Sequence, residues 1–179
     1  MEIKETDAIC LKAVDYKDND KLITLYASGL GKITVCAKGC KKPKAKLKFA
    51  ASIFCFGHYY LTKKGSMYTL TGCDLIDSFY DLALDPEKFY SAAVIVEILE
   101  KMGMEDDYNN NLLVTCLKCL KEIAYGKEET KKVLFIYLRE ILSSLGYKCN
   151  AVTFMEYYNY LLHTHGVNIN SLKELTKLN

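Results

Sequence analysis

Hydrophobic and polar residues alternate in short runs along roughly the first 75 residues of the chain. A period of two is typical of strands whose faces meet different surroundings, and glycine-bearing or polar turns separate these runs. The pattern predicts five strands, over residues 6–15, 22–27, 32–37, 52–61 and 67–71. Short strands at such close intervals favour a small antiparallel barrel, and the five-stranded oligonucleotide-binding (OB) fold fits their number and size.

From residue 85 onward the apolar positions recur every three to four residues, which indicates amphipathic helices. Asp85 is a suitable N-cap for the first helix, and Pro86 is a suitable first residue. The apolar stripes predict helices over residues 86–103, 112–123, 130–145 and 152–162, and a short one over 171–178. The expected fold class is α+β, with an OB-fold barrel over residues 1–78 followed by an all-α helical domain over residues 79–179.

Composition places the chain among globular proteins. No apolar run approaches the ~20 residues of a membrane-spanning helix, and the charged N-terminus lacks the apolar core of a signal peptide. We therefore expect a cytoplasmic protein without membrane contact, whose eight cysteines are reduced. Four of them lie in apolar or strand-like runs, where small buried hydrophobic side chains are expected: Cys10, Cys36, Cys55 and Cys73.

The net charge of +2 is unevenly distributed along the chain. Residues 1–74 hold 13 lysines against 7 acidic residues, whereas residues 75–179 hold 11 basic and 15 acidic residues. Lysine supplies nearly all the positive charge, since Arg139 is the only arginine. Lysine acts as a point charge toward phosphates, whereas bidentate reading of guanine edges favours arginine. If nucleic acid binds the basic part, we therefore expect binding that does not depend on base sequence.

Residues 38–48 form the most basic stretch, which we call the lysine loop. It contains no acidic residue and six lysines: Lys38, Lys41, Lys42, Lys44, Lys46 and Lys48. Gly39 and Pro43 interrupt regular structure, so we expect a flexible loop that follows the third strand. Phosphate groups are the natural ligand of such a run, and the alternative is a solvated loop without a partner. Lys63 and Lys64, in a later turn, are expected to join the phosphate-binding residues.

Aromatic residues in the barrel region have two interpretations. Barrels of this kind stack bases on aromatic side chains within a basic groove, but most aromatics in a small barrel fill its core. Core filling is the favoured interpretation for each one. The candidates are Tyr16, Tyr26, Phe49, Tyr59, Tyr60 and Tyr68.

Two groups of side chains suggest metal ligands. Cys116 and Cys119 have the CxxC spacing, but they lie inside an amphipathic helix without a second such pair, so packing in the helix core is favoured. Cys149, His163 and His165 could supply three ligands, with irregular spacing and no evident fourth. We therefore expect no metal and no other cofactor.

Catalytic patterns are not evident. The chain has no phosphate-binding loop of the Walker type and no nucleophile–histidine–acid arrangement in local sequence, so we expect no enzyme activity. Asp15, Asp18 and Asp20 share one polar turn, where carboxylates are expected to form the turn and to solubilise it.

Three stretches carry a resemblance to a known family. Residues 20–26 (DKLITLY) and 31–44 (GKITVCAKGCKKPK) are similar to a D-K-hydrophobic-hydrophobic-T strand followed by G-K…A-K-G-x-[RK]-[RK]-P-K in RecO, a bacterial family of recombination mediators. Residues 68–79 resemble the last barrel strand and its exit. Residues 142–147, which end in Leu-Gly-Tyr, resemble the helix before the family's metal module.

The resemblance implies an N-terminal OB-fold DNA-binding domain and a C-terminal helical domain. It implies binding to single- and double-stranded DNA and annealing of complementary strands. It also implies partnership with RecR and with the C-terminal tail of single-stranded-DNA-binding protein, assistance to RecA loading, and a nucleoid-associated location in the cytoplasm.

One departure from the family concerns zinc. Many members carry a four-cysteine zinc module after the Leu-Gly-Tyr helix, whereas here Cys149 has no partner cysteine after it. Residues 160–166 and 171–175 nevertheless resemble the closing helix of the family. We interpret the chain as a short member in which the zinc module is missing and its ends are joined.

The sequence therefore predicts a non-enzymatic recombination mediator in DNA repair, whose lysine loop contacts phosphates together with Lys63 and Lys64. In the alternative hypothesis the barrel is a scaffold, and the helical domain binds an acidic peptide tail or a partner subunit. Basic residues beside its apolar surface would then meet the acidic partner: Lys118, Lys121, Lys131 and Lys132.

Overall fold

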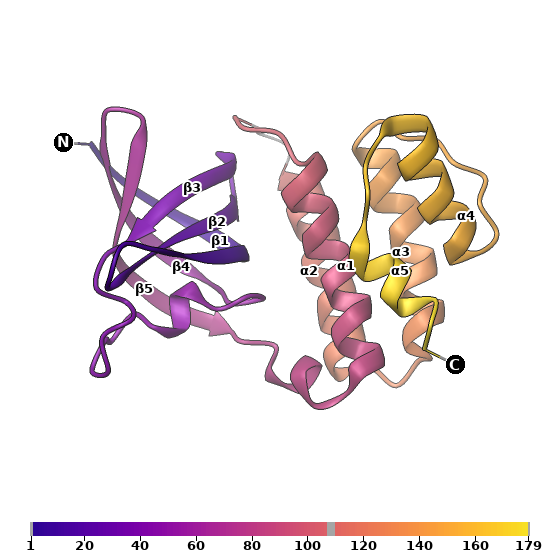
Figure 1. The fold of residues 1–179 in the computed structure, drawn as a ribbon, viewed down its shortest axis with the longest axis horizontal. Coiled ribbons are helices and arrows are strands. Elements are labelled where there is room, and N and C mark those ends of the chain that lie inside the picture. The colour runs from indigo at the N-terminus through magenta and orange to yellow at the C-terminus, as the bar shows by residue number, and fades with distance from the viewer. Residues whose placement is uncertain (1, 107–109, 179) are drawn as a thin grey trace. The chain divides into compact units, whose positions relative to one another are not determined.

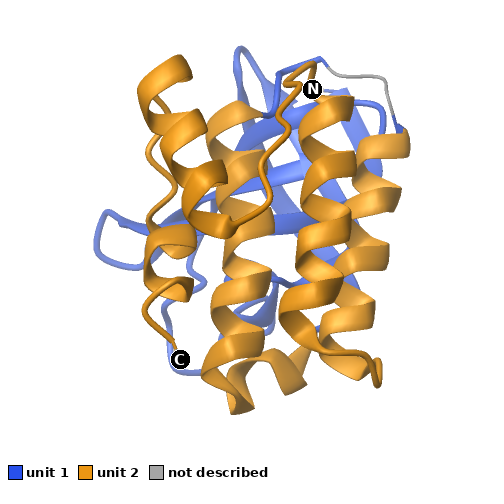
Figure 2. Ribbon diagram, turned by 90° about the vertical axis from the view of Figure 1, so that its right-hand side faces the viewer, with its two compact units in different colours: residues 1–78, 103–110 blue, residues 79–102, 111–179 orange. Residues whose placement is uncertain are grey.

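The computed structural model describes residues 2–106 and 110–178, and the chain divides into two compact units (Figure 2). The first unit contains residues 1–78 and 103–110, and the second contains residues 79–102 and 111–179. Each unit has its own buried apolar core. We describe each unit by itself.

The first unit is a closed five-stranded barrel (Figure 1). Its strands are β1 (Glu2–Tyr16), β2 (Asp20–Ala27), β3 (Gly31–Ala37), β4 (Phe56–Lys64) and β5 (Met67–Asp77). Around the barrel they follow the order β1-β2-β3-β5-β4, and β1 closes it by pairing with both β2 and β4. The β3–β5 pair is parallel and the other four pairs are antiparallel. The predicted OB fold is confirmed.

The long first strand explains how the barrel closes. Residues 2–9 of β1 pair with β4, and residues 8–16 pair with β2. A register shift between Cys10 and Lys12 lies close to the point where β1 passes from one neighbour to the other. Such bulges bend a strand and increase its twist, which is what a closed barrel requires. The strand predicted from the sequence began at residue 6, four residues later than β1 does, because residues 2–5 are mostly polar and exposed.

The barrel core follows the alternation read from the sequence. Inward-facing residues of β1, β2 and β3, such as Ala8, Ile23 and Val35, are fully buried. Cys10, Cys36 and Cys55 are also buried, as expected, whereas Cys73 is half-buried, and all eight cysteines are free thiols.

The fourth strand begins later than predicted. Residues 52–55 form a turn rather than a strand, and Phe54 adopts a left-handed backbone with φ of 70°. This turn is bonded to β1, because the Phe54 amide donates to the Cys10 carbonyl and the Cys10 amide donates to the Cys55 carbonyl, both at 2.9 Å. The strand predicted over residues 52–61 is therefore extended only from Phe56 onward.

The second unit is helical. After a 3₁₀ turn (Tyr80–Leu84) come α1 (Pro86–Met102), α2 (Asn110–Tyr125), α3 (Thr130–Ser144), α4 (Phe154–Asn159) and α5 (Asn170–Leu175). The helix α1 packs against α3 and α5. The helix expected over residues 152–162 is instead α4 followed by a π-helical turn (Tyr160–Thr164). No helix among the described residues has the length and apolar character needed to span a membrane.

Candidate nucleic-acid interface

The lysine loop leaves β3 at Lys38 and ends at a 3₁₀ turn (Phe49–Ala51). Its base is tied to the turn between β1 and β2. The Gly39 amide donates to the Asp20 carboxylate at 2.7 Å, and the Lys41 amide donates to the Asn19 carbonyl at 3.0 Å. Gly39 has φ of 66°, a conformation that glycine adopts without strain. The loop expected to be flexible therefore has a hydrogen-bonded base.

Most of the loop lysines point their charge to solvent. Five of them are exposed, and within residues 2–106 and 110–178 none of the five forms an ion pair with a carboxylate: Lys38, Lys42, Lys44, Lys46 and Lys48. Like charges this close in sequence repel one another, and the repulsion is relieved by a polyanion. The loop is therefore a candidate phosphate-binding surface.

Lys41 differs from the other loop lysines. It is half-buried, and its Nζ lies 2.7 Å from Oδ2 of Asp15 at the end of β1. The hydrogen bond from Lys41, together with its charge, holds the pKa of the Asp15 carboxyl below its usual value. The carboxylate predicted only to form a turn thus neutralises one lysine of the loop.

A pocket of about 230 Å³ opens at the base of the lysine loop, and we call it the loop pocket. Its lining residues are Asp15, Lys21, Cys40, Lys41, Lys48 and Ala51. Cys40 and Ala51 are buried, and the charged lining residues are three lysines and Asp15. Lys21 was missed in the sequence. The hairpin register could have revealed it, because Lys21 pairs with Asp15 on one side and with Ala37, beside Lys38, on the other.

Lys63 and Lys64 lie elsewhere on the barrel, at the hairpin between β4 and β5. Figure 1 shows this hairpin and the lysine loop at opposite ends of the barrel. Lys64 is exposed, whereas Lys63 places its Nζ 5.0 Å from the ring centroid of Tyr68. The two groups of lysines therefore do not share a pocket.

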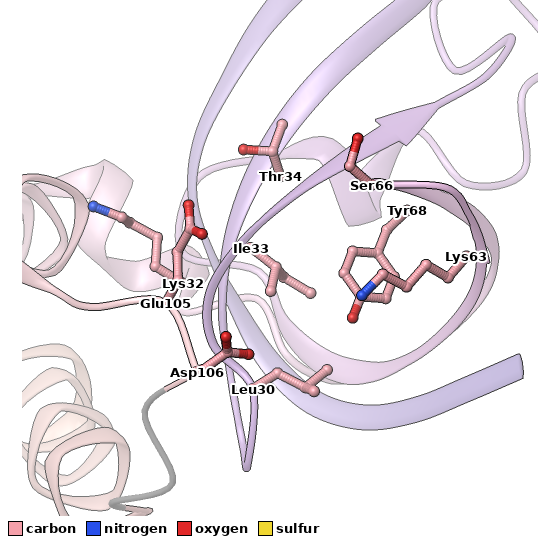
Figure 3. Close-up of a pocket in the computed structure, with 9 residues that line it drawn as sticks. All are labelled: Leu30, Lys32, Ile33, Thr34, Lys63, Ser66, Tyr68, Glu105 and Asp106. Carbon is pink, nitrogen blue, oxygen red and sulfur yellow. The ribbon is translucent and has the colours of Figure 1, made fainter. Parts of the chain in front are cut away.

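Figure 3 shows the pocket of about 290 Å³ beside Lys63, which we call the hairpin pocket. Glu105 and Asp106 also line it, because residues 103–106 run along the start of β3. The Lys32 amide donates to the Met104 carbonyl at 2.8 Å, and the Asp106 amide donates to the Leu30 carbonyl at 3.0 Å. Two carboxylates at this pocket reduce its attraction for phosphate, so it is a weaker candidate than the loop pocket.

The candidate stacking aromatics separate by burial. Tyr26 and Tyr59 are core residues, and the Tyr59 hydroxyl donates to the Ala50 carbonyl at 3.0 Å. Tyr68 is also buried, with 8% of its surface exposed. The remaining three candidates are half-buried and keep part of a ring accessible: Tyr16, Phe49 and Tyr60.

The candidate metal ligands do not come together. Cys116 and Cys119 are buried in α2, and burial raises the pKa of both thiols, as expected of core residues. The His165 ring instead meets the edges of Tyr147 and Tyr160, at centroid distances of 4.7 and 4.9 Å. In the described part of the chain, no group of three or more histidine, cysteine or acidic side chains could hold a metal ion.

The lysines proposed for an acidic partner are placed differently from one another. Lys118 and Lys121 are exposed on α2. Lys131 pairs with Glu87 at 3.4 Å and donates to the Leu178 carbonyl at 2.7 Å. A separate pocket of about 230 Å³ in the helical unit is lined by two cationic side chains and several polar ones: Arg139, Leu142, Ser143, Tyr147, Lys148, Cys149, Asn150 and Tyr157. We call it the helical pocket.

The fold and the candidate site define the class of this protein. It is an OB-fold protein whose barrel carries a cationic loop and pocket and is joined in one chain to a helical unit. Within that class, residues 1–79 match the family described as "Recombination protein O N terminal". The barrel therefore matches the RecO N-terminal family over its whole length, and the resemblance of the chain to RecO is confirmed.

Curated relatives extend the similarity beyond the barrel. The chain is 29% identical to the DNA repair protein RecO of Acetivibrio thermocellus over 88% of its length, which covers 66% of that relative. It is 35% identical to RecO of Clostridium perfringens over 72% of the chain and 53% of the relative. It is 32% identical to RecO of Shouchella clausii over 70% of the chain and 49% of the relative. The chain thus spans about half to two thirds of these relatives.

Proposed function

We propose that this protein is a DNA-binding recombination mediator that acts in DNA repair and holds strands by their phosphates. One observation carries the proposal: the lysine loop presents five exposed ammonium groups without carboxylate partners in the described structure, beside a pocket lined by three lysines. The relatives are named DNA repair protein RecO, and these names support a role in DNA repair. In this proposal the protein acts without catalysing a reaction, and it binds DNA in the cytoplasm, at the nucleoid.

Contact with phosphates also explains how such a protein would bring two strands together. Lysines that neutralise phosphate charge reduce the repulsion between complementary strands, and the same surface accepts single- and double-stranded DNA. Lys63 and Lys64, at the other end of the barrel, form a second and smaller contact. The family resemblance supplies the partners: RecR, the C-terminal tail of single-stranded-DNA-binding protein and, indirectly, the RecA filament.

The test replaces three exposed loop lysines with glutamine, in a Lys42→Gln, Lys44→Gln, Lys46→Gln variant. None of the three has an ion pair in the described structure, so the fold should be retained. We expect affinity for oligo(dT) to fall about tenfold or more, and the slope of log K against log salt to fall by about 2, from about 0.7 per lost contact. Fluorescence anisotropy between about 50 and 200 mM salt measures both.

A matched control removes two exposed lysines of the helical unit, as Lys118→Gln, Lys121→Gln. This control should leave oligo(dT) affinity within about twofold, because the substitutions lie outside the barrel surface. If the loop variant binds oligo(dT) as tightly as the wild type does, the loop is not the DNA-binding surface. If the helical variant loses as much affinity, binding is not located on the barrel.

The helical pocket favours a second candidate function, the binding of an acidic peptide tail. Arg139 and Lys148 line this pocket, and they provide charge complementary to a carboxylate. Tyr157, whose side chain is fully buried, also lines this pocket. The acidic-tail hypothesis thus moves from the four lysines of α2 and α3 to this pocket.

A further inference from the structure

Asp15 and Lys41 occupy an unusual position in a surface built to attract anions. The lysine loop has no acidic residue of its own, yet the β1 strand places the Asp15 carboxylate 2.7 Å from the Lys41 ammonium group. Asp15 has 67% of its side chain exposed, whereas Lys41 has 29% exposed. The carboxylate therefore has room to move into solvent while the lysine stays at the pocket.

The backbone around the loop pocket is held in place by contacts that do not depend on the Asp15–Lys41 ion pair. Lys21 lies in β2, whose backbone pairs with β1 on one side and with β3 on the other. The backbone of Lys41 is fixed by the hydrogen bond to Asn19, and the turn before it by the bond from Gly39 to Asp20. A pocket whose walls are already ordered loses little conformational entropy when a ligand enters.

The chemistry of the pocket favours a phosphate group. Three lysines from separate segments line it, Lys21 of β2, Lys41 of the lysine loop and Lys48 at the end of that loop, and lysine ammonium groups are donors for phosphate oxygens. A volume of about 230 Å³ holds a phosphate and several waters, each of which occupies roughly 30 Å³. The floor, made by Cys40 and Ala51, offers no hydrogen-bonding side chain except a thiol.

We propose that the loop pocket is a phosphate-binding subsite in which Asp15 holds Lys41 until a phosphate of a nucleic-acid backbone takes the place of the carboxylate. This inference rests on the proposed function and adds to it a residue, Lys21, and a counterion, Asp15. An exposed ion pair contributes little stability, so a phosphate displaces the carboxylate readily. Asp15 thus weakens DNA binding and keeps it reversible.

The first test is Asp15→Asn, measured by anisotropy with oligo(dT) of about 25 nucleotides. Removing the competing carboxylate should raise affinity about threefold to tenfold and steepen the salt dependence by about 0.7, the contribution of one further phosphate contact. The matched control is Asp18→Asn, which removes the same charge from the turn that follows β1, outside the pocket. The control should change affinity less than about twofold.

A double substitution distinguishes local competition from a general charge effect. In the Lys41→Gln background, Asp15→Asn should no longer raise affinity, because the lysine that it releases is absent. The proposal is wrong if Asp15→Asn and Asp18→Asn raise affinity equally, or if the gain survives without Lys41. Circular dichroism spectra that match the wild type show that each variant is folded.

Lys21→Gln tests the pocket from the other side and identifies the source of the phosphate. It should weaken oligo(dT) binding about threefold or more. Inorganic phosphate should also compete less well with the oligonucleotide for the variant than for the wild type, when sodium chloride at equal ionic strength is the reference. If only the competition by inorganic phosphate changes, the site serves a free anion and the proposal fails. If the wild type binds no oligonucleotide at all, the proposed function fails instead.

Discussion

His58 illustrates how a single cross-strand pair shifts the pKa of a side chain on the barrel. Asp7 on β1 lies directly opposite His58 on β4, with Oδ1 2.7 Å from Nδ1. The hydrogen bond to Asp7 raises the pKa of His58 above its ordinary value of 6.5, and the charges of Asp7 and Glu5 act in the same direction. In sequence, His58 had no acidic neighbour, because its partner is 51 positions away.

Asp7→Asn should therefore lower the pKa of His58, as measured by NMR titration of the ring protons. Because the pKa is raised in the folded state, the pair stabilises the fold below pH 6.5 and loses this effect as pH rises through the raised pKa. The stability difference between wild type and variant should thus be larger at acidic than at alkaline pH. Glu5→Gln, whose carboxylate lies 3.8 Å away, should shift the pKa less. An unchanged pKa in Asp7→Asn would contradict the assignment.

At the scale of elements, one carboxylate joins two helices of the second unit. Glu97 of α1 accepts hydrogen bonds from the amides of Asn170 and Ser171, at 2.9 and 2.8 Å, and thereby caps the start of α5. Lys101 and the Ser171 hydroxyl also donate to it. Burial alone would raise the pKa of Glu97, but these hydrogen bonds outweigh burial and hold it below its usual value. Helix α5 has six residues, too few for stability without such contacts.

Glu97→Gln should destabilise the helical unit by about 2 kcal/mol, the scale of hydrogen bonds to a charged group. Because the folded-state pKa is lowered, the stabilisation is present above the unfolded-state pKa and disappears as pH falls through the folded-state value. Urea denaturation at neutral and acidic pH, with hydrogen exchange of the α5 amides, measures both effects. Glu128→Gln, which removes an exposed ion pair with Lys132, is the control and should cost less than about 0.5 kcal/mol. Equal losses in both variants would contradict the capping role.

For the molecule as a whole, the two candidate binding surfaces lie on different units. The loop pocket is part of the barrel unit, and the helical pocket is part of the helical unit. Both carry cationic side chains, but the first is surrounded by further lysines, whereas the second has one arginine and one lysine. We therefore expect a polyanion at the first and a short acidic segment at the second.

The two activities should consequently be separable by substitution. Arg139→Gln should weaken binding of an acidic peptide with a free C-terminal carboxylate about tenfold and leave oligo(dT) affinity within about twofold. The Lys42, Lys44, Lys46 variant should show the reverse pattern. Calorimetric titration with the peptide and anisotropy with the oligonucleotide measure the two affinities. If Arg139→Gln leaves peptide binding intact, the helical pocket is not the acidic-tail site.

Several features followed from local sequence patterns alone. Alternation predicted all five strands, the 3.6-residue period predicted the first three helices closely, and the run of lysines marked the candidate surface. These are local properties, since the direction of a side chain depends on the period of its own element. Less regular segments were predicted less well: residues 52–55 form a turn that is hydrogen-bonded to the distant Cys10, and residues 160–164 form a π-helical turn.

The composition of each candidate site was decided only by the tertiary structure. Lysines at positions 21 and 41 share a pocket with Asp15, whereas Lys63 lines a different pocket, together with Glu105 and Asp106. Nothing in the charge of a residue says which other charges it will face. Strand register places Lys21 opposite Asp15, and the path of residues 103–106 along β3 brings two carboxylates to the hairpin pocket. The sequence by itself determined that the barrel carries a cationic loop. The fold decided which other lysines share a pocket with that loop and which carboxylates lie in the same pocket.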